Sequence, residues 1–199
     1  MPPIPTRRAS VADLEALIAD VQAGFDSYVE FAPLGWVAPE VEADGELMAE
    51  LLNDEETWAL LALAGPAAPA GPAGPAGPAG SAGSAGSAGS DPVGHIAFTP
   101  ARRRAPGQPW ATSPATPGLA HLWQLFVLPA WWGRGVAPLL HDAAIEEMRA
   151  RDYQSARLYT PALHARARRF YERRGWLPTG EQWNDHLTLM LTEYRLALS

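Results

Sequence analysis

The sequence has no cysteine, no lysine and no long apolar run, and each absence excludes a class of protein. Without cysteine there is no disulfide, thiolate metal site or cysteine nucleophile. Without lysine, a phosphate-binding loop of the G-x-x-x-x-G-K-[ST] type is excluded. No stretch approaches the roughly 18 apolar residues of a membrane span. Asp13, Glu15 and Asp20 occupy the region where a signal peptide needs an apolar run. We therefore expect a cytoplasmic protein with no membrane partner.

Length and composition indicate one folded domain. The chain has 199 residues, of which 47% are hydrophobic and 8 are tryptophan, which is enough for a real core. Residues 65–90 contain only Gly, Pro, Ala and Ser, with glycine at every third position from 71 to 89. Apolar, strand-like segments at 57–64 and 93–99 flank this tract. We predict a single domain over 1–199, in which 65–90 is a low-complexity loop joining two strands.

The spacing of apolar residues predicts a mixed α/β order of elements. Ser10 and Asp13 have the spacing of a capping box and predict a helix over 11–29. The other expected elements are a short helix near 41–52, strands at 57–64, 93–99 and 120–128, a helix at 136–149, a strand at 155–160, a helix at 163–170 closed by Gly175, and a strand at 186–197.

Charge is unevenly distributed along the chain. Residues 1–64 contain 2 Arg and 13 acidic residues, a net charge of −11, whereas residues 91–199 contain 13 Arg and 9 acidic residues, a net charge of +4. One interpretation is that most of these charges are solvated helix faces. The other is that an anionic ligand binds the second half and a cationic one approaches the first. Charge alone does not decide between them.

A strand, a glycine-containing turn and a helix follow one another directly between residues 125 and 149. Leu125 to Pro129 is the apolar strand end, Gly133 and Gly135 form the turn, and the helix begins near Val136. Free backbone N–H groups and the helix dipole make such a turn an anion site. A Rossmann site is a poor match, because the G-x-G-x-x-G spacing and the later acidic residue are both missing.

Two motifs in this region resemble the GNAT superfamily of acyl-CoA-dependent N-acetyltransferases. The family pattern Gln/Arg-x-x-Gly-x-Gly/Ala is matched by the six residues from Trp132 to Ala137, except that Trp132 stands at the first position. The residues from Leu163 to Trp176 are similar to the family's Asn-x-x-Ala-x-x-Phe-Tyr-x-x-x-Gly-Phe, with His164 for Asn and Trp176 for Phe. The order and separation of the two motifs also match the family.

The resemblance implies a fold and a cosubstrate. The fold would be a central mixed, mostly antiparallel sheet with helices on both faces, splayed between strands 4 and 5, with the tract between strands 2 and 3. Acetyl-CoA would place its pyrophosphate on the loop amides and its pantetheine arm along strand 4, where the N–H of Val127 or Leu128 would polarise the thioester carbonyl. The implied cofactor-binding residues are Phe126, Val127, Leu128, Trp132, Gly133, Arg134, Gly135, Val136 and Ala137.

The resemblance also implies two catalytic candidates. Tyr171 matches the family tyrosine that protonates the departing CoA thiolate, although a tyrosine that anchors the helix in the core is the alternative. His121 occupies the start of the fourth strand, where family members often place a glutamate, and an ordinary pKa near 6.5 suits a general base. The alternative for His121 is a strand-end histidine bonded to backbone or water.

The acceptor would be a small-molecule or peptide amine covered by the first helical region. Phe31 and Trp36 are candidates for the walls of its pocket, and Glu30 would attract a cationic amine. A metal site is not expected, because the five histidines show no i, i+4 pairing and cysteine is absent. Nucleic acid is not expected as a partner, because the net charge of −7 outweighs the arginine runs.

The sequence therefore predicts an N-acetyltransferase that moves an acetyl group from acetyl-CoA to a primary amine by direct attack in a ternary complex. A non-catalytic acyl-CoA-binding or sensing module on the same fold is the alternative. An interaction protein that uses the tract as a spacer has less support. The identity of the amine, the acyl-chain preference and pairing into a homodimer stay open.

Overall fold

The structure is a computed structural model that describes residues 3–41, 45–65, 91–102 and 113–198. Seven strands form one sheet in the order β1-β2-β3-β4-β5-β7-β6. The strands are β1 (Thr6–Arg8), β2 (Trp58–Leu63), β3 (Pro92–Arg102), β4 (Ala115–Val127), β5 (Ser155–Pro161), β6 (Leu177–Asn184) and β7 (Leu189–Ala197). The helices are α1 (Leu14–Asp26), α2 (Gly45–Asn53), α3 (Val136–Ala150) and α4 (Ala165–Glu172).

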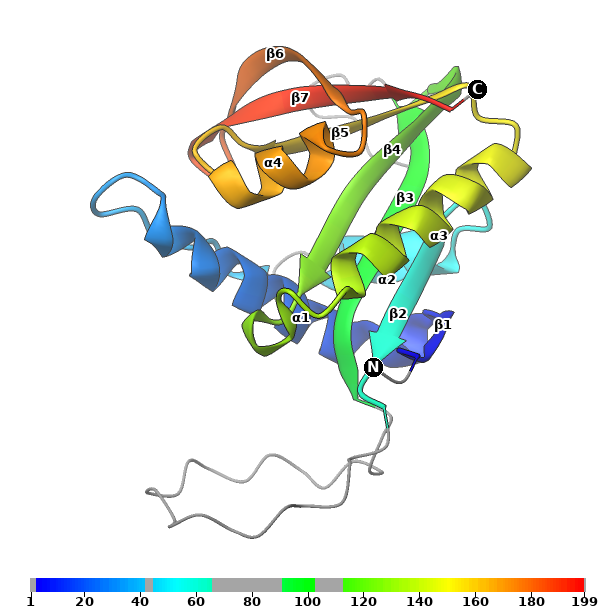
Figure 1. Ribbon diagram of the computed structural model, residues 1–199, viewed down its shortest axis with the longest axis horizontal. Helices are drawn as coiled ribbons and strands as arrows, with labels where there is room; N and C mark the ends of the chain where they lie inside the picture. Colours follow the sequence, from blue (N-terminus) through cyan, green and yellow to red (C-terminus); the bar gives the residue numbers. More distant parts are fainter. Residues whose placement is uncertain (1–2, 42–44, 66–90, 103–112, 199) are drawn as a thin grey trace, which may run out of the picture.

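Helices cover both faces of this sheet, as predicted (Figure 1). Alternate residues of a strand point to opposite faces, and the core divides accordingly. Leu60 and Ile96 pack on the face covered by α3, together with Leu140 and Met148 of that helix. Leu61 packs on the opposite face against Leu17 of α1 and Met48 of α2. The mixed α/β fold class predicted from the element order is confirmed.

The sheet opens between its fourth and fifth strands. β4 and β5 are the one parallel pair among the described strands, and they pair only from Leu119 to His121 against Ser155 to Arg157. Beyond this point the two strands diverge (Figure 1). The register of β4 against β3 also shifts, because Ala97 pairs with Gln124 and Phe98 pairs with Leu122. Trp123 is therefore the extra residue of a β-bulge, which bends the strand where the opening begins.

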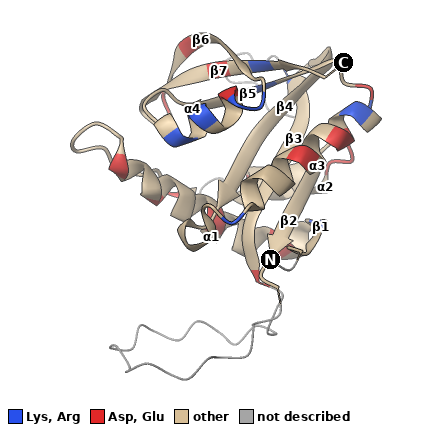
Figure 2. Ribbon diagram, viewed as in Figure 1, with Lys and Arg blue, Asp and Glu red and all other residues tan. Residues whose placement is uncertain are grey.

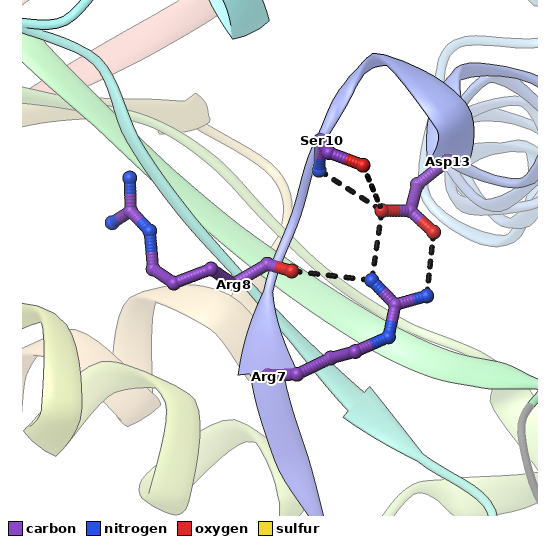
Figure 3. A network of polar contacts seen from close by, with 4 residues as sticks. All are labelled: Arg7, Arg8, Ser10 and Asp13. Atoms are coloured by element: carbon purple, nitrogen blue, oxygen red, sulfur yellow. Dashed lines mark hydrogen bonds and ion pairs between the residues drawn. The ribbon is translucent and has the colours of Figure 1, made fainter.

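The start of α1 depends on a charged contact that the sequence only partly predicts. Asp13 accepts a hydrogen bond from the Ser10 N–H at 2.9 Å, as a capping box requires. Arg7 adds two hydrogen bonds to the same carboxylate, at 2.8 and 2.6 Å (Figure 3). The Arg7 guanidinium is the main reason that the pKa of Asp13 is lowered from its usual range. This contact ties the edge strand β1 to the helix.

The structure adds to or trims the sequence prediction in three places. The strand expected over 186–197 is confirmed as β7, but the sequence analysis missed β6, which pairs with β7 as a hairpin. The helix expected over 11–29 is regular only over Leu14–Asp26, with 3-10 turns on either side. The edge strand β1 was not expected, because its three exposed residues carry no apolar pattern.

The tract at 65–90 lies, apart from Gly65, outside the described residues. Its flanks are adjacent antiparallel strands, with Leu63 of β2 opposite Pro92 of β3. The Ala64 N–H also donates to the Asp91 carbonyl at 2.9 Å. The tract thus connects the ends of two neighbouring strands, and the single-domain organisation around it stays a prediction.

Candidate active site

A cavity of about 550 Å³ occupies the opening between β4 and β5. One wall is β4 and the loop that follows it, and another is the C-terminal half of β5 with α4. The end of α1 closes it through Gly24, Ser27 and Tyr28. Residues of both sequence motifs, one in the loop after β4 and the other in α4, therefore line the same cavity.

Backbone N–H groups converge at the start of α3. The N–H groups of Gly133, Gly135, Val136 and Ala137 have no hydrogen-bond partner within the described residues. Gly133 and Gly135 have φ angles of +74° and +85°, a left-handed backbone that only glycine adopts without strain. A side chain at either glycine would point into open space, so the loop surface is bare backbone. Free amides and the helix dipole make this a strong anion site.

Arginines add positive charge to this side of the cavity. Arg166 and Arg173 of the α4 region line the cavity, and Figure 2 shows the arginines gathered on this helix. The Arg166 guanidinium lies over the Trp132 ring at 4.1 Å. Arg134, which the sequence offered as a phosphate ligand, does not line the cavity, and its guanidinium lies 5.2 Å from the centre of the Trp131 ring. The backbone N–H of Arg134 donates to the Trp131 carbonyl.

The edge of β4 that faces the cavity has free backbone groups. Backbone groups of a strand point alternately to its two edges. The Leu128 N–H donates to the Val93 carbonyl at 3.0 Å on the β3 side. The N–H and C=O of Val127 therefore face the open edge, and the indole N–H of Trp132 donates to that C=O at 2.7 Å. Of the two donors proposed from the sequence, Leu128 is occupied, whereas the Val127 N–H faces the cavity.

Two tyrosines lie at the inner end of the cavity. Tyr171 of α4 is buried, packs against Trp176 and Tyr194, and lines the cavity, as Tyr28 does from the residues after α1. Burial is the main cause that raises the pKa of each phenol, and the proximity of Tyr28 raises that of Tyr171 further. Both hydroxyls are therefore protonated at neutral pH and can donate a hydrogen bond.

His121 lies at the vertex of the opening and does not line the cavity. It is the last residue of β4 paired with β5, opposite Arg157. Burial, followed by the charge of Arg157, lowers the pKa of His121 to about 3, which makes its imidazole a weak base. Its ring contacts Tyr159, which does line the cavity, at 5.7 Å between centroids. The geometry does not support His121 as a direct base for an amine in the cavity.

His164 lines the cavity, although the sequence analysis assigned it no role. It precedes α4 and lines the cavity beside Thr160. Burial and then the charge of Arg166 lower its pKa to about 4, so it is neutral at pH 7. Its position in the α4 motif, where the family pattern has Asn, was the signal that could have identified it.

The predicted acceptor residues are separated from the main cavity. The Phe31 ring stacks on His164 at 4.4 Å between centroids and lines a second, smaller cavity. Trp36 donates its indole N–H to the Leu187 carbonyl at 2.7 Å, which attaches the loop after α1 to the β6–β7 turn. Glu30 is exposed and lines neither cavity. Phe31 contacts the lining residue His164 and Trp36 packs on the lining residue Tyr28, with 6.2 Å between the ring centroids, whereas Glu30 lies away from the site.

The described residues hold neither a cluster of metal ligands nor a membrane-spanning helix. No group of three or more histidine, aspartate or glutamate side chains is placed to hold a metal ion in the described segments. Within the same segments, no helix is long and apolar enough to cross a bilayer.

Solved structures with the same fold include acetyltransferases at low sequence identity. An N-acetyltransferase from Staphylococcus aureus is 13% identical with a TM-score of 0.62, and 99% of each chain is covered. The PaiA N-acetyltransferase from Thermoplasma acidophilum, solved with coenzyme A, is 16% identical with a TM-score of 0.60, covering 98% of this chain and 99% of that one. The ribosomal-protein-S18-alanine N-acetyltransferase from Escherichia coli is 12% identical with a TM-score of 0.59, covering 98% and 94%.

The comparison with family models is more specific. A search of curated protein sequences finds no match. The model of the acetyltransferase (GNAT) family matches residues 75–176, about half of the chain, and this range includes the loop amides, the opening between β4 and β5, and α4. Together with the splayed sheet, this match shows that the chain belongs to the GNAT family of acetyltransferases.

Proposed function

We propose that this protein transfers an acetyl group from acetyl-CoA to a primary amine by direct attack within a ternary complex. The observation that carries the proposal is the course of the main cavity. It runs from the free amides at the start of α3, along the open edge of β4, to Tyr171. A phosphate site, a strand edge and a phenol donor thus occur in the order in which pyrophosphate, pantetheine and thioester sulfur follow one another in acetyl-CoA.

The residues of the cavity fit acetyl-CoA. The four unpartnered amides of Gly133, Gly135, Val136 and Ala137 would bind the pyrophosphate, with Arg166 and Arg173 beside them. The free edge of β4 would pair with the amides of the pantetheine arm. The coenzyme A complex of the Thermoplasma acidophilum protein, which has the same fold, is consistent with this assignment.

The chain's own groups would support the chemistry in two ways. The Val127 N–H faces the open edge and would donate a hydrogen bond to the thioester carbonyl, which favours attack by the amine nitrogen. The protonated Tyr171 hydroxyl would donate to the sulfur that leaves. Acetyl-CoA supplies the activated acyl group, and the amine must arrive neutral or lose its proton to water, because the lowered pKa of about 4 makes the His164 imidazole a weak base.

The test is release of free thiol from acetyl-CoA by the purified protein against a panel of primary amines. Amine-dependent release, with an acetylated product identified by mass spectrometry, is the expected result. If the protein binds acetyl-CoA but no amine causes thiol release, transfer to an amine is contradicted. The alternative of a non-catalytic acyl-CoA sensor would then be favoured, because it predicts binding without turnover.

A further inference from the structure

Trp132 bridges two walls of the main cavity. It lies in the loop between β4 and α3, and its indole N–H donates to the Val127 carbonyl at 2.7 Å. The Arg166 guanidinium of α4 lies over the same indole, 4.1 Å from the ring centre. All three residues line the cavity. One side chain thus connects the end of β4 to the start of α4 across the opening of the sheet.

The backbone of Trp132 is held separately from its side chain. Its backbone N–H donates to the Pro129 carbonyl at 3.1 Å and ends the 3-10 turn Pro129–Trp131. The indole can therefore leave the Val127 carbonyl by rotation about its side-chain bonds alone. The free amides that follow, from Gly133 to Ala137, need not move when the indole does.

The two groups that hold the indole are groups that acetyl-CoA would use. The Val127 carbonyl lies on the open edge of β4, where an amide N–H of the pantetheine arm would donate to it. Because the indole stands on that edge, the arm and the indole exclude each other. Arg166 forms no ion pair within the described residues, and its guanidinium is a natural partner for the pyrophosphate.

The strength of the bridge sets how much it weakens binding. A hydrogen bond between uncharged groups and a cation–π contact at an exposed arginine each change an equilibrium constant by a factor of about two to ten. Together they favour the bridged form by about tenfold. A guanidinium–phosphate hydrogen bond is roughly twice as strong as a neutral one, so a pyrophosphate displaces the ring from Arg166. A ligand without phosphate gains nothing in exchange for that contact.

We propose that Trp132 is a gate on the cosubstrate site: its indole occupies the edge of β4 where the pantetheine arm binds, and Arg166 holds it there until a phosphate takes that arginine. This inference rests on the proposed function, because it concerns the acetyl-CoA site of that transfer. The gate lowers the affinity for every ligand with a pantetheine arm. Arg166 therefore acts in two opposite senses: it strengthens the binding of a ligand that carries phosphate and weakens the binding of one that does not.

The test measures, by calorimetry, the Kd values of coenzyme A and of pantetheine, which has the same arm and no phosphate. Trp132→Ala removes the gate and should tighten the binding of both ligands by about tenfold. Trp132→Phe keeps a ring for Arg166 but loses the N–H donor, so it should tighten both by about threefold. Arg166→Gln should weaken the binding of coenzyme A by about tenfold and tighten that of pantetheine by about threefold.

Two control variants change the same residue types outside the main cavity. Trp183→Ala on β6 and Arg169→Gln on α4 each alter an exposed side chain that does not line this cavity. Both should bind the two ligands with wild-type affinity. Trp132→Phe retains an aromatic ring and reports on the gate even if Trp132→Ala fails to fold, which thermal denaturation detects.

The outcomes separate the gate from the proposed function. Unchanged or weaker binding of coenzyme A by the folded Trp132 variants would overturn the gate and leave the function standing. Unchanged or weaker binding of pantetheine by Arg166→Gln would overturn it as well, because a mere phosphate ligand does not affect pantetheine. If the affinities change as stated but no amine is acetylated, the gate is supported and the transfer is contradicted. If neither ligand binds to the wild type or to any variant, both are overturned.

Discussion

Asp20, His95 and Gln124 form a buried polar chain that fastens α1 to the sheet. One ring nitrogen of His95 lies 2.5 Å from Asp20 Oδ2 and the other lies 3.2 Å from Gln124 Oε1. The imidazole thus bridges a carboxylate on α1 and an amide on β4. The chain lies beside Phe126 of β4, so it helps to hold the strand that forms the cavity wall.

We expect Asp20→Asn to destabilise the fold strongly. The buried Asp20 carboxylate shares a hydrogen bond with His95, and weakening a buried hydrogen bond to a carboxylate typically costs about 1 to 3 kcal/mol. Urea denaturation measures the change in the free energy of unfolding. Asp26→Asn, an exposed position of the same helix, is the control and should cost well under 1 kcal/mol. Equal stability of the two variants would show that the buried pair contributes little.

Tyr171→Phe should lower kcat by about ten- to a hundredfold, which is the low end for general acid catalysis, because a thiol already leaves readily. The ring stays in place against Trp176, so the Kd for acetyl-CoA should not change. Steady-state kinetics and calorimetry measure the two quantities. Tyr153→Phe, outside the cavity, is the matched control. An unaltered kcat would assign Tyr171 a purely structural role.

At this scale the sequence predicts a residue's neighbourhood better than its role. Tyr171 and the glycines of the loop lie in the cavity because local motifs place them there. Whether His121 reaches the cavity depends on where β4 and β5 separate. Whether Glu30 reaches it depends on the direction of the 3-10 turn that Glu30 ends. Neither is encoded in the neighbouring sequence. Contacts between distant segments, such as the stacking of Phe31 on His164, cannot be read from spacing at all.

Among the elements, the loop before α3 is the most sensitive to change. Gly135 begins the helix in a left-handed conformation, which costs other residues about 1 to 2 kcal/mol. We expect Gly135→Ala to weaken acetyl-CoA binding by about tenfold, because relief of that strain turns the amides away from the anion. Gly180→Ala on β6, with an ordinary backbone and open space around it, is the control. Calorimetry measures both, and unchanged affinity in Gly135→Ala would contradict the amide site.

Deletion of residues 67–88 should leave the fold and the activity intact. β2 and β3 already pair up to Leu63 and Pro92, and the Ala64 N–H bonds to the Asp91 carbonyl, so the four residues left between Ala64 and Asp91 suffice to join the strands. Shortening the loop reduces the entropy of closure, which should stabilise the fold by about 1.6 kcal/mol at about 0.6 kcal/mol for each halving. Thermal denaturation and the thiol-release assay measure the result. A deletion variant that fails to fold would contradict the loop assignment.

The elements with strong apolar periodicity were predictable, and the weakly patterned ones were not. α3 and β5 agree with the sequence to within a residue or two, since each buries one regular face. β6 escaped prediction because its residues are almost all exposed, and an edge strand without a buried face has no alternating pattern to detect.

Across the whole molecule, burial lowers the pKa of histidines and raises the pKa of tyrosines, so both kinds of pKa lie further from neutral pH. The pKa values of His121 and His164 fall to about 3 and about 4, and those of Tyr28 and Tyr171 rise. Each shift has burial as its main cause. Between pH 6 and 8 the imidazoles therefore stay neutral and the phenols stay protonated, and the charge of these groups is constant.

The rate should therefore follow the protonation of the amine alone. We expect kcat/KM for the amine to rise about tenfold per pH unit from pH 6 to 8, because the neutral fraction of an alkyl amine rises at that rate below its pKa. Initial rates in buffers of constant ionic strength measure the profile. An additional inflection near pH 6.5 would reveal a catalytic imidazole with an ordinary pKa, contrary to these shifts.

The fold as a whole was predictable because two motifs and the order of the elements agree. The family resemblance predicted that the sheet opens between its fourth and fifth strands, and the short β4–β5 pairing confirms this. What the sequence could not supply is the second cavity. Its walls come from the loop after α1, the end of β5 and the β6–β7 hairpin, which only tertiary packing brings together.

The short pairing of β4 with β5 also suggests a structural role for the acetyl-CoA whose binding we propose. Beyond Leu119 to His121 the β4 backbone has β3 on one side but no strand on the β5 side, so only this short pairing joins the two halves of the sheet. A pantetheine arm laid along that edge would complete the hydrogen bonding that the polypeptide leaves unfinished. The cosubstrate would thus be a structural part of the enzyme during each turnover, and its departure would leave the two half-sheets joined only by the short β4–β5 pairing.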